Sequence, residues 1–410
     1  MKSAHVRRSA GAVGIAAVLA LAAACSSSAS DAASSSPSPG SGAEVKIGLV
    51  VPLTGAISAG FAGFVNAAQA RVDLANAAAG STHQIKLIVA DDQSTPQGAL
   101  AAAQSLVAQG VAAVEVAAPT DFDGAAQAYV SGHSIPIISP NMQTEGEFKD
   151  PNNYSILGVG GSAAPPVDAL GAFLKSQGVQ SVALVGWGEV EASVDLLKAE
   201  QPGLQEQGVK TALEDVSSTP TTTDYTSVAL AVKKSGAQTV YAAMTVASEA
   251  SLDQALLQQG VPLKAVVNFP TVFESSSLTG PDAAAFNNTY FLSAYAPQGV
   301  DAPGAKTFAQ AASSGRFADG ENEKDGFIES DLLVQALSSV KGTVTPASLT
   351  EAIRGITSYN ADGLLANTVS FAPKSRGSDQ NVQKCNWYVQ IKAGKFVVLQ
   401  QQPVCAKIIG

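Results

Sequence analysis

The order of apolar and amphipathic segments constrains the fold more than any other feature of this sequence. From Glu44 onward, short Val- and Ile-rich segments bounded by turn residues alternate with segments of helical spacing. Such short apolar segments are typical of strands buried on both faces of a sheet. In the first half, the predicted strands are VKIGLVVPL (45–53), IKLIVA (85–90), AAVEVAAP (112–119), IPIISP (135–140) and YSILGV (154–159), and the predicted helices are 62–79, 96–109 and 121–132. Repeated β-α-β units predict a parallel sheet covered on both faces.

The same alternation begins again in the second half. The predicted strands there are SVALVGW (181–187), TALEDV (211–216), TVYAAMT (239–245) and KAVVNF (264–269), and the predicted helices are 165–177, 190–207, 223–235, 247–259, 305–318, 325–340 and 346–355. With 410 residues the chain is too long for one compact core. The sequence therefore predicts an α/β protein with two units of similar plan.

Three Gly- and Pro-rich segments are candidate crossings between these units: GVGGSAAPP (158–166), YAPQGVDAPG (295–304) and SFAPKSRGSDQN (370–381). The first also contains G-x-G-x-x-A, the dinucleotide-binding pattern. However, Pro165 and Pro166 follow it directly. The pattern also needs an Asp or Glu at the end of a second strand about twenty residues later, and none stands there. We therefore interpret it as a crossing, and three crossings suit hinge bending.

The N-terminus has the pattern of an export signal. Lys2, Arg7 and Arg8 precede an apolar run that is too short to span a membrane, and small residues lead to Cys25. This resembles a bacterial lipobox, in which the cysteine is lipidated and becomes the new N-terminus, although Ala22 stands where a larger apolar residue is usual. The alternative is an ordinary signal peptide cleaved near an A-x-A site.

Ser, Ala, Pro and Gly dominate the segment after Cys25 and predict a disordered tether. The predicted organisation is a lipoprotein signal peptide at 1–24, a tether at 25–44, a first lobe at 45–160 and 298–360, and a second lobe at 161–297 and 361–410.

Composition and motifs argue against several classes of function. The net charge is −10 without a basic stripe, which argues against nucleic acid as a partner. There is no P-loop, no G-x-S-x-G and no H-E-x-x-H. Beyond the signal segment, the histidines are His83 and His133, so no zinc site is indicated. We expect no cofactor, no metal and no catalytic step.

The remaining cysteines flank a predicted hairpin. Cys385 and Cys405 lie on either side of WYVQIK-AG-KFVVLQ. An exported protein meets oxidising conditions, which favour a disulfide between them. Two free thiols are the alternative.

Taken in order, the segments resemble the leucine/isoleucine/valine-binding family of type I periplasmic binding proteins over roughly residues 45–410. The resemblance rests on VKIGLVVPLTGAIS, ADDQSTPQGALAAAQSLVAQGVAAV and SGHSIPIISPNMQ in the first half, and on SQGVQSVALVGWGE, TTTDYTSVALAVKKSGAQTVYAAM and LLQQGVPLKAVVNF in the second. It implies two Rossmann-like lobes, joined by a three-segment hinge, that close on a small ligand. It also implies binding sites at the carboxyl ends of the strands, in accord with the general rule for open α/β sheets.

The resemblance assigns ligand contacts to both lobes. In the first lobe these are Phe61, Thr120 with the adjacent Asp121, Asn141, Met142 and Gln143; in the second they are Trp187, Glu189, Thr245 and Phe273. Thr120 corresponds to a hydroxyl that holds the ligand carboxylate, although it could instead cap a helix starting at Asp121. Trp187 could instead be a core aromatic, and Asp121 could serve a helix N-terminus.

The ammonium side of an amino-acid site departs from the family pattern. The family places an acid just after the strand that corresponds to KAVVNF, where this chain has Phe269, Pro270 and Thr271. An unpaired ammonium in a closed site costs several kcal/mol. Glu274 lies a few residues after the position of the family's acid. Glu189 or Glu191, in the loop after a neighbouring strand, could instead pair with the ammonium. A branched-chain amino acid and a related amide or carboxylate therefore both remain candidate ligands.

These features predict a monomeric receptor, lipid-anchored on the outer face of the cell membrane, that delivers its ligand to an ABC permease. A binding protein of a signalling system is the alternative, and an enzyme using the same site is a more remote one.

Overall fold

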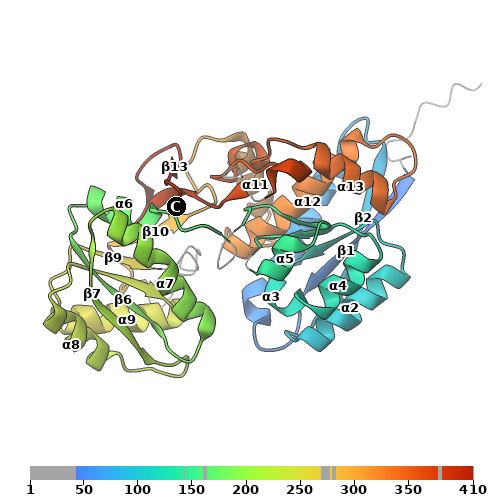
Figure 1. Ribbon diagram of the computed structural model, residues 1–410. Coiled ribbons are helices and arrows are strands. Elements are labelled where there is room, and N and C mark those ends of the chain that lie inside the picture. Colours follow the sequence, from blue (N-terminus) through green and yellow to red (C-terminus); the bar gives the residue numbers. More distant parts are fainter. Residues whose placement is uncertain are drawn as a thin grey trace, which may run out of the picture. The chain divides into compact units, whose positions relative to one another are not determined.

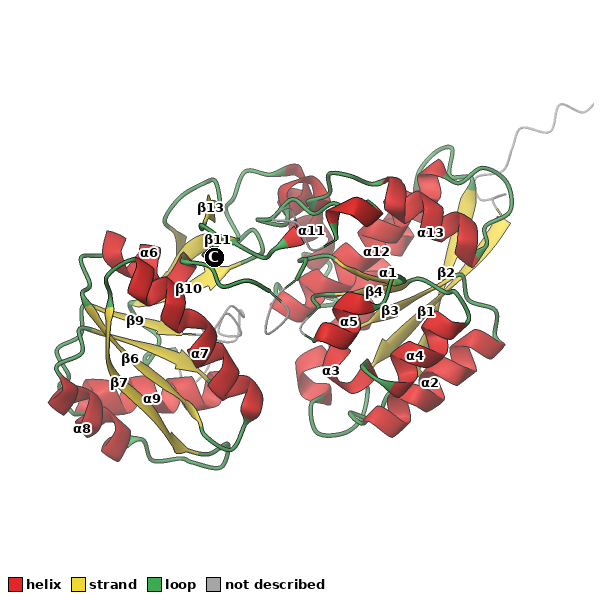
Figure 2. Cartoon of the chain, viewed as in Figure 1, coloured by secondary structure: helices red, strands yellow, loops and turns green. Residues whose placement is uncertain are grey.

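The computed structural model describes residues 43–142, 144–159, 164–268, 278, 283–376 and 381–409, apart from the side chains of Glu191 and Ala192. The predicted signal peptide, most of the tether and Cys25 lie outside these residues. Two β-sheets, each with helices on both faces, form the structure (Figures 1 and 2). The predicted fold class, an α/β protein of two lobes, is confirmed.

The first sheet is parallel throughout. Its strand order is β2 (His83–Asp91), β1 (Ala43–Val51), β3 (Ala113–Val116), β4 (Ile137–Ser139) and β5 (Asn153–Ser155). The helices of this lobe are η1 (Ser58–Phe61), α1 (Phe64–Ala77), α2 (Pro96–Ala108), α3 (Pro119–Phe122), α4 (Ala125–Gly132), α5 (Glu145–Lys149), α11 (Pro303–Ala312), α12 (Glu321–Ser339) and α13 (Pro346–Gly355). Helices α2 and α4 pack together on one face, and α1 packs on α12 on the other.

Side chains on the two faces of β1 pack into two different helix–sheet cores. Ile47 belongs to the core beneath α1 and α12, whereas Val50 belongs to the core beneath α2 and α4. Gly48 faces α2, where an added Cβ would lie 2.8 Å from a methyl carbon of Leu106. The close approach of α2 therefore favours a glycine at this position.

The second sheet is mixed. Its order is β12 (Lys395–Val398), β11 (Cys385–Lys392), β10 (Thr289–Ser293), β9 (Ala265–Asn268), β8 (Thr239–Ala243), β6 (Ser181–Trp187) and β7 (Lys210–Ser218), and β13 (Val404–Cys405) also pairs with β11. Its helices are α6 (Ala169–Ser176), α7 (Glu191–Glu206), α8 (Thr226–Ser235) and α9 (Val246–Gln258). The predicted hairpin is present as β11 and β12, antiparallel to each other, while β10 and β13 were not predicted.

Local signals explain several helix ends. Thr95 Oγ1 accepts a hydrogen bond from the Gly98 amide at 3.0 Å, and Pro96 is the first residue of α2, as predicted. Helix α8 ends at Ser235, where the predicted helix 223–235 also ends, and Gly236 follows it with a φ of 70°. Helix α8 begins at Thr226, later than expected, and Asp224 Oδ1 accepts the Thr226 amide at 2.9 Å.

The single helix predicted over 121–132 is wrong. The chain forms α3 and then α4, with Asp123 and Gly124 between them, because Gly124 adopts a φ of 81°. Thr120 therefore does not cap a helix at Asp121. It lies inside α3, whose N-cap is Ala118.

The first and third predicted crossings lie side by side, since the Val159 amide donates to Asn381 O at 2.6 Å, and the second begins beside Leu365. The backbone of Val159 pairs with Met142 and with Val382, and Tyr295 pairs with Leu365. Asn367 joins this group, since its Nδ2 donates to Val382 O at 2.9 Å and its Oδ1 accepts the Cys385 amide at 2.8 Å. The lobe boundaries given above stay a prediction.

A disulfide joins Cys385 to Cys405, which are directly opposite each other in β11 and β13. It closes the base of the C-terminal hairpin. Among the described helices, none has the length and apolar character needed to cross a membrane.

Candidate functional site

The loops that follow β1, β3 and β4 share one edge of the first sheet, because these strands are parallel neighbours. Two hydrogen bonds hold these loops to neighbouring segments of the edge. Thr144 Oγ1 donates to Asp123 Oδ2 at 3.0 Å, which ties the loop after β4 to the loop after β3. At the other end, Thr54 Oγ1 donates to Asp91 Oδ2 at 2.7 Å, which ties the loop after β1 to the end of β2. We call this the carboxyl edge of the first sheet.

Thr120 and Asp121 lie at this edge, directly after β3. Thr120 is exposed, and Asp121 is half-buried. Burial raises the pKa of the Asp121 carboxyl above its usual value. Pro119 starts the short helix α3 and so fixes the backbone that presents both side chains.

Asn141 and Met142 follow β4 at the same edge. Asn141 Oδ1 is buried without a hydrogen-bond partner among the described residues. A buried acceptor left in this way costs free energy until a donor reaches it. Met142 is only 5% exposed, and its backbone pairs with Val159 of the first crossing.

The other first-lobe candidates are Phe61 and Gln143. Phe61 ends η1 and is half-buried, with its ring centroid 6.4 Å from that of Phe64. Gln143 lies outside the described residues.

In the second lobe, Trp187 ends β6 but points into the core. Its side chain is 8% exposed and packs with Tyr225 and Met244. The indole Nε1 donates to Tyr225 Oη at 3.3 Å. This packing leaves little of the ring for a ligand and favours the core role.

Glu189 and Thr245 are the exposed second-lobe candidates. Glu189 lies in the turn between β6 and α7, and Thr245 precedes α9 as its N-cap residue without a side-chain capping bond. Because β6 and β8 are parallel neighbours, both residues follow strands at the same edge of the second sheet. Phe273 and Glu274 lie outside the described residues, as does the side chain of Glu191.

Buried acids are the main polar groups that the sequence analysis did not single out. Glu115 in β3 is 1% exposed, and Ser330 Oγ lies 3.0 and 3.1 Å from its two carboxyl oxygens. Burial raises the pKa of Glu115 to about 8. Burial first, and then the charges of Glu115 and Asp325, raise the pKa of Glu329 well above its usual value. A glutamate inside an apolar predicted strand was the available signal for Glu115.

Glu249 is a further buried acid, in the first turn of α9. Its Oε1 accepts the Met244 amide at 3.2 Å, which fixes the turn between β8 and α9 beside Thr245. Within the part of the chain that the structure describes, no three His, Cys, Asp or Glu side chains group as metal ligands would.

Comparison with known proteins gives a consistent result. The profile of the periplasmic binding protein family matches residues 44–395. No match was found among curated proteins. Solved structures of the same fold include a branched-chain amino acid transporter substrate-binding protein, LivJ of Streptococcus pneumoniae, in complex with isoleucine. It has a TM-score of 0.69 at 16% identity, with 88% of this chain and 99% of that chain covered.

Two other solved structures of this fold are described with other classes of ligand. A solute-binding protein of R. palustris, in complex with 4-hydroxybenzoate, has a TM-score of 0.69 at 15% identity, with 88% of this chain and 97% of that chain covered. A fatty acid ABC transporter substrate-binding protein of Thermomonospora curvata has a TM-score of 0.67 at 16% identity, with 90% and 94% covered. The family profile spans most of the chain, and the resemblance to the leucine/isoleucine/valine-binding proteins is confirmed: this chain belongs to the periplasmic binding protein family.

Proposed function

We propose that this protein is the solute-binding receptor of an ABC importer and that it binds a small polar ligand at the carboxyl edges of its two sheets. Membership of the periplasmic binding protein family supports this role. Several solved relatives of the same fold are described as substrate-binding proteins of ABC transporters. Ligand binding shifts the receptor toward a closed form that docks on the permease, and no catalytic step is involved.

The observation that carries the ligand assignment is the pair of polar groups at the carboxyl edge of the first sheet. The exposed hydroxyl of Thr120 is a donor for a ligand carboxylate. The buried Asn141 Oδ1 lacks a donor among the described residues, and a ligand N–H or O–H would supply one. A carboxylate that also carries a hydrogen-bond donor fits both groups. A branched-chain amino acid and a related amide or hydroxy-carboxylate belong to this class.

The second lobe supplies Glu189 and Thr245 as polar contacts in this proposal, and Phe61 supplies apolar surface from the first lobe. If the ligand is an amino acid, Glu189 pairs with its ammonium group. The signalling role remains the second candidate function, since the same ligand-dependent closure could be read by a membrane sensor instead of a permease.

A thermal-shift screen tests the proposal. The full chain with Cys25→Ser, which avoids lipidation, is screened against amino acids, their amides, small organic acids and sugars. A ligand at one hundred times its dissociation constant stabilises the folded state by about 2.7 kcal/mol, which gives a clear shift in Tm. If no compound in the set raises the Tm, the result counts against a small-solute receptor.

Variants at the site make the test specific. Thr120→Val removes the hydroxyl with little change in shape, and we expect it to abolish the shift caused by a carboxylate ligand. The matched control is Thr343→Val, an equally exposed threonine in the turn before α13. Glu189→Gln separates the ligand classes: loss of binding indicates an ammonium contact, whereas retained binding indicates a ligand without one.

A further inference from the structure

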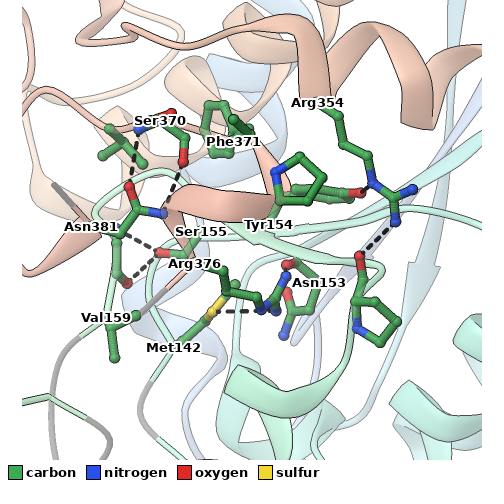
Figure 3. Close-up of a pocket in the computed structure, with 15 residues that line it drawn as sticks. Met142, Asn153, Tyr154, Ser155, Val159, Arg354, Ser370, Phe371, Arg376 and Asn381 are labelled. Atoms are coloured by element: carbon green, nitrogen blue, oxygen red, sulfur yellow. Dashed lines mark hydrogen bonds between the residues drawn. The ribbon is translucent and has the colours of Figure 1, made fainter. Parts of the chain in front are cut away.

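A cavity of about 200 Å³ lies between β5 and the segment 369–376 of the third crossing (Figure 3). Most of its lining is apolar and includes Val159, Val369 and Phe371. The exceptions that matter chemically are two guanidinium groups, those of Arg354 and Arg376.

Among the described residues, the hydrogen-bond partners of Arg376 are neutral acceptors. Its Nε donates to Phe148 O at 2.7 Å, and its Nη2 donates to Asn153 O at 3.1 Å and to Asp150 O. Met142 Sδ lies 3.8 Å from the same Nη2. Carbonyl oxygens orient the guanidinium, but they do not neutralise its charge.

The nearby carboxylate of Asp150 is engaged elsewhere. Its Oδ1 accepts the Ser131 hydroxyl at 2.6 Å and the Asn152 amide at 2.9 Å, and its Oδ2 accepts from Gln127 Nε2 at 3.0 Å. The Asp150 carboxylate therefore acts on Arg376 only from a distance, through its charge, whereas the Asp150 carbonyl accepts a direct hydrogen bond.

Arg354, in the last turn of α13, is also bound to neutral groups. Its Nε donates to Tyr154 Oη at 2.9 Å, and its Nη2 donates to Pro151 O at 3.1 Å. Burial lowers the pKa of the Arg376 guanidinium; Tyr154 and Asp150 oppose this shift, and the charge of Arg354 adds to it. Two like charges thus share one half-buried pocket, with no ion pair to either from the described residues.

We propose that this pocket, which adjoins the carboxyl edge of the first sheet at Met142, is a second binding site for a small organic carboxylate with a compact apolar body. A charge withdrawn from water costs free energy unless a counter-ion accompanies it. The planar guanidinium fork matches a carboxylate in geometry. The apolar wall around Phe371 takes the body of the ligand, which inorganic phosphate lacks. The cavity is smaller than the roughly 300–1,000 Å³ of drug-sized sites, so the ligand is small.

The site has a mechanical consequence, since the crossing supplies part of its wall. Val159 belongs to the first crossing, and Phe371 and Arg376 belong to the third, whereas Arg354 and Tyr154 belong to the first lobe. A bound carboxylate therefore ties both crossings to β5 and α13. This proposal does not depend on the proposed import function. If the import function is disproved, carboxylate binding in this pocket can still be correct.

Isothermal titration calorimetry on the full chain with Cys25→Ser tests the proposal at pH 7. The probes are benzoate, its uncharged analogue benzamide, and inorganic phosphate, each at millimolar concentration. We expect benzoate to bind and each of the other two to bind at least about tenfold more weakly, since one lacks the charge and the other the apolar body.

Variants locate the site. Arg354→Met should weaken benzoate by at least about tenfold. Arg354→Lys should weaken it by a smaller factor, because the charge stays and the fork is lost. The control is Arg316→Gln, which removes a charge that pairs with Asp73 outside this lining. In Thr120→Val, which removes a receptor-site contact, the benzoate binding that depends on Arg354 should persist.

A second measurement covers the case in which Arg354→Met does not fold. A crystal soaked with 4-bromobenzoate should show the anomalous signal of bromine between Arg354 and Phe371. The proposal is overturned if benzoate does not bind, if Arg354→Lys and Arg316→Gln bind it equally well, if Thr120→Val abolishes binding, or if the bromine lies only elsewhere.

Discussion

At the scale of single residues, the buried acids of the first lobe set how stability depends on pH. Glu115 and Glu329 come from β3 and α12, more than two hundred residues apart in the chain, and both are almost fully buried. A folded-state pKa above the unfolded value means that the native protein holds protons that the unfolded chain releases. The contribution of these groups to stability is therefore greatest in acid and falls as pH rises toward the folded pKa.

The substitution Glu115→Gln tests this residue directly. The folded pKa of Glu115 is about 8 against an ordinary value of 4.5, so its contribution to stability is lost between these two pH values. Glutamine keeps an acceptor for Ser330 and cannot ionise. We expect the variant to be more stable than the wild type by about 1–3 kcal/mol at pH 9, with a smaller difference at pH 5.

Urea unfolding at both pH values measures the effect. The matched control is Glu351→Gln, since Glu351 is exposed on α13 and should give no such pH-dependent gain. A gain from Glu115→Gln that is the same at pH 5 and pH 9 would contradict the assignment.

At the scale of elements, most helices and strands could be predicted, because strands buried on both faces give short apolar runs. The predicted start of α2 at Pro96 was also correct. Strands β10 and β13 were missed because they are short and depend on pairing with the distant β11. The break between α3 and α4 was signalled by the Asp123-Gly124 pair, which is a common turn sequence.

The site was predictable to a lesser extent. Thr120 and Asn141 lie at the carboxyl edge because the strand order alone places them there. The direction in which Trp187 points was not predictable, since a residue at a strand end can face the core or the solvent. The meeting of Arg354 and Arg376 in one pocket depends on tertiary packing and has no local signal.

The α3–α4 break gives an element-scale prediction. Gly124 has a φ of 81° and a ψ of −111°, and nothing lies within 4 Å of an added Cβ. Gly124→Ala should therefore destabilise the protein by about 1–2 kcal/mol through backbone strain alone. Gly132→Ala, at the end of α4 and equally unhindered, is the control and should be neutral or stabilising by up to about 1 kcal/mol. Equal effects of the two substitutions in denaturant unfolding would rule out strain at Gly124.

At the scale of the whole molecule, the disulfide near the C-terminus contributes to stability. The disulfide joins residues 20 apart at the base of the C-terminal hairpin. Replacing Cys385 and Cys405 together by Ser should lower the free energy of unfolding by about 2–4 kcal/mol. The wild-type protein under reducing conditions should unfold at the same denaturant concentration as the variant, and a clear difference between the two would show that the serines act by another route.

The predicted anchor at Cys25 gives a test in cells. Cys25→Ala should release the exported protein into the medium, because the thiol that receives the lipid is gone. Fractionation followed by mass spectrometry of the N-terminus measures this, with Ser26→Ala as the control that should stay in the membrane fraction. A Cys25→Ala protein that remains in the membrane would favour another mode of attachment.

Helix α12 also determines when the first lobe can finish folding. It packs on α1 and β3, and Figure 1 shows it (orange) beside elements from the blue, N-terminal part of the chain. Until residues 321–339 are available, α1 alone of these two helices covers its face of the first sheet, so a growing chain cannot finish its first lobe. A polypeptide threaded across a membrane must stay unfolded until it emerges. If the chain is exported, as its N-terminal segment predicts, the late position of α12 in the sequence favours an unfolded chain during export, through connectivity alone.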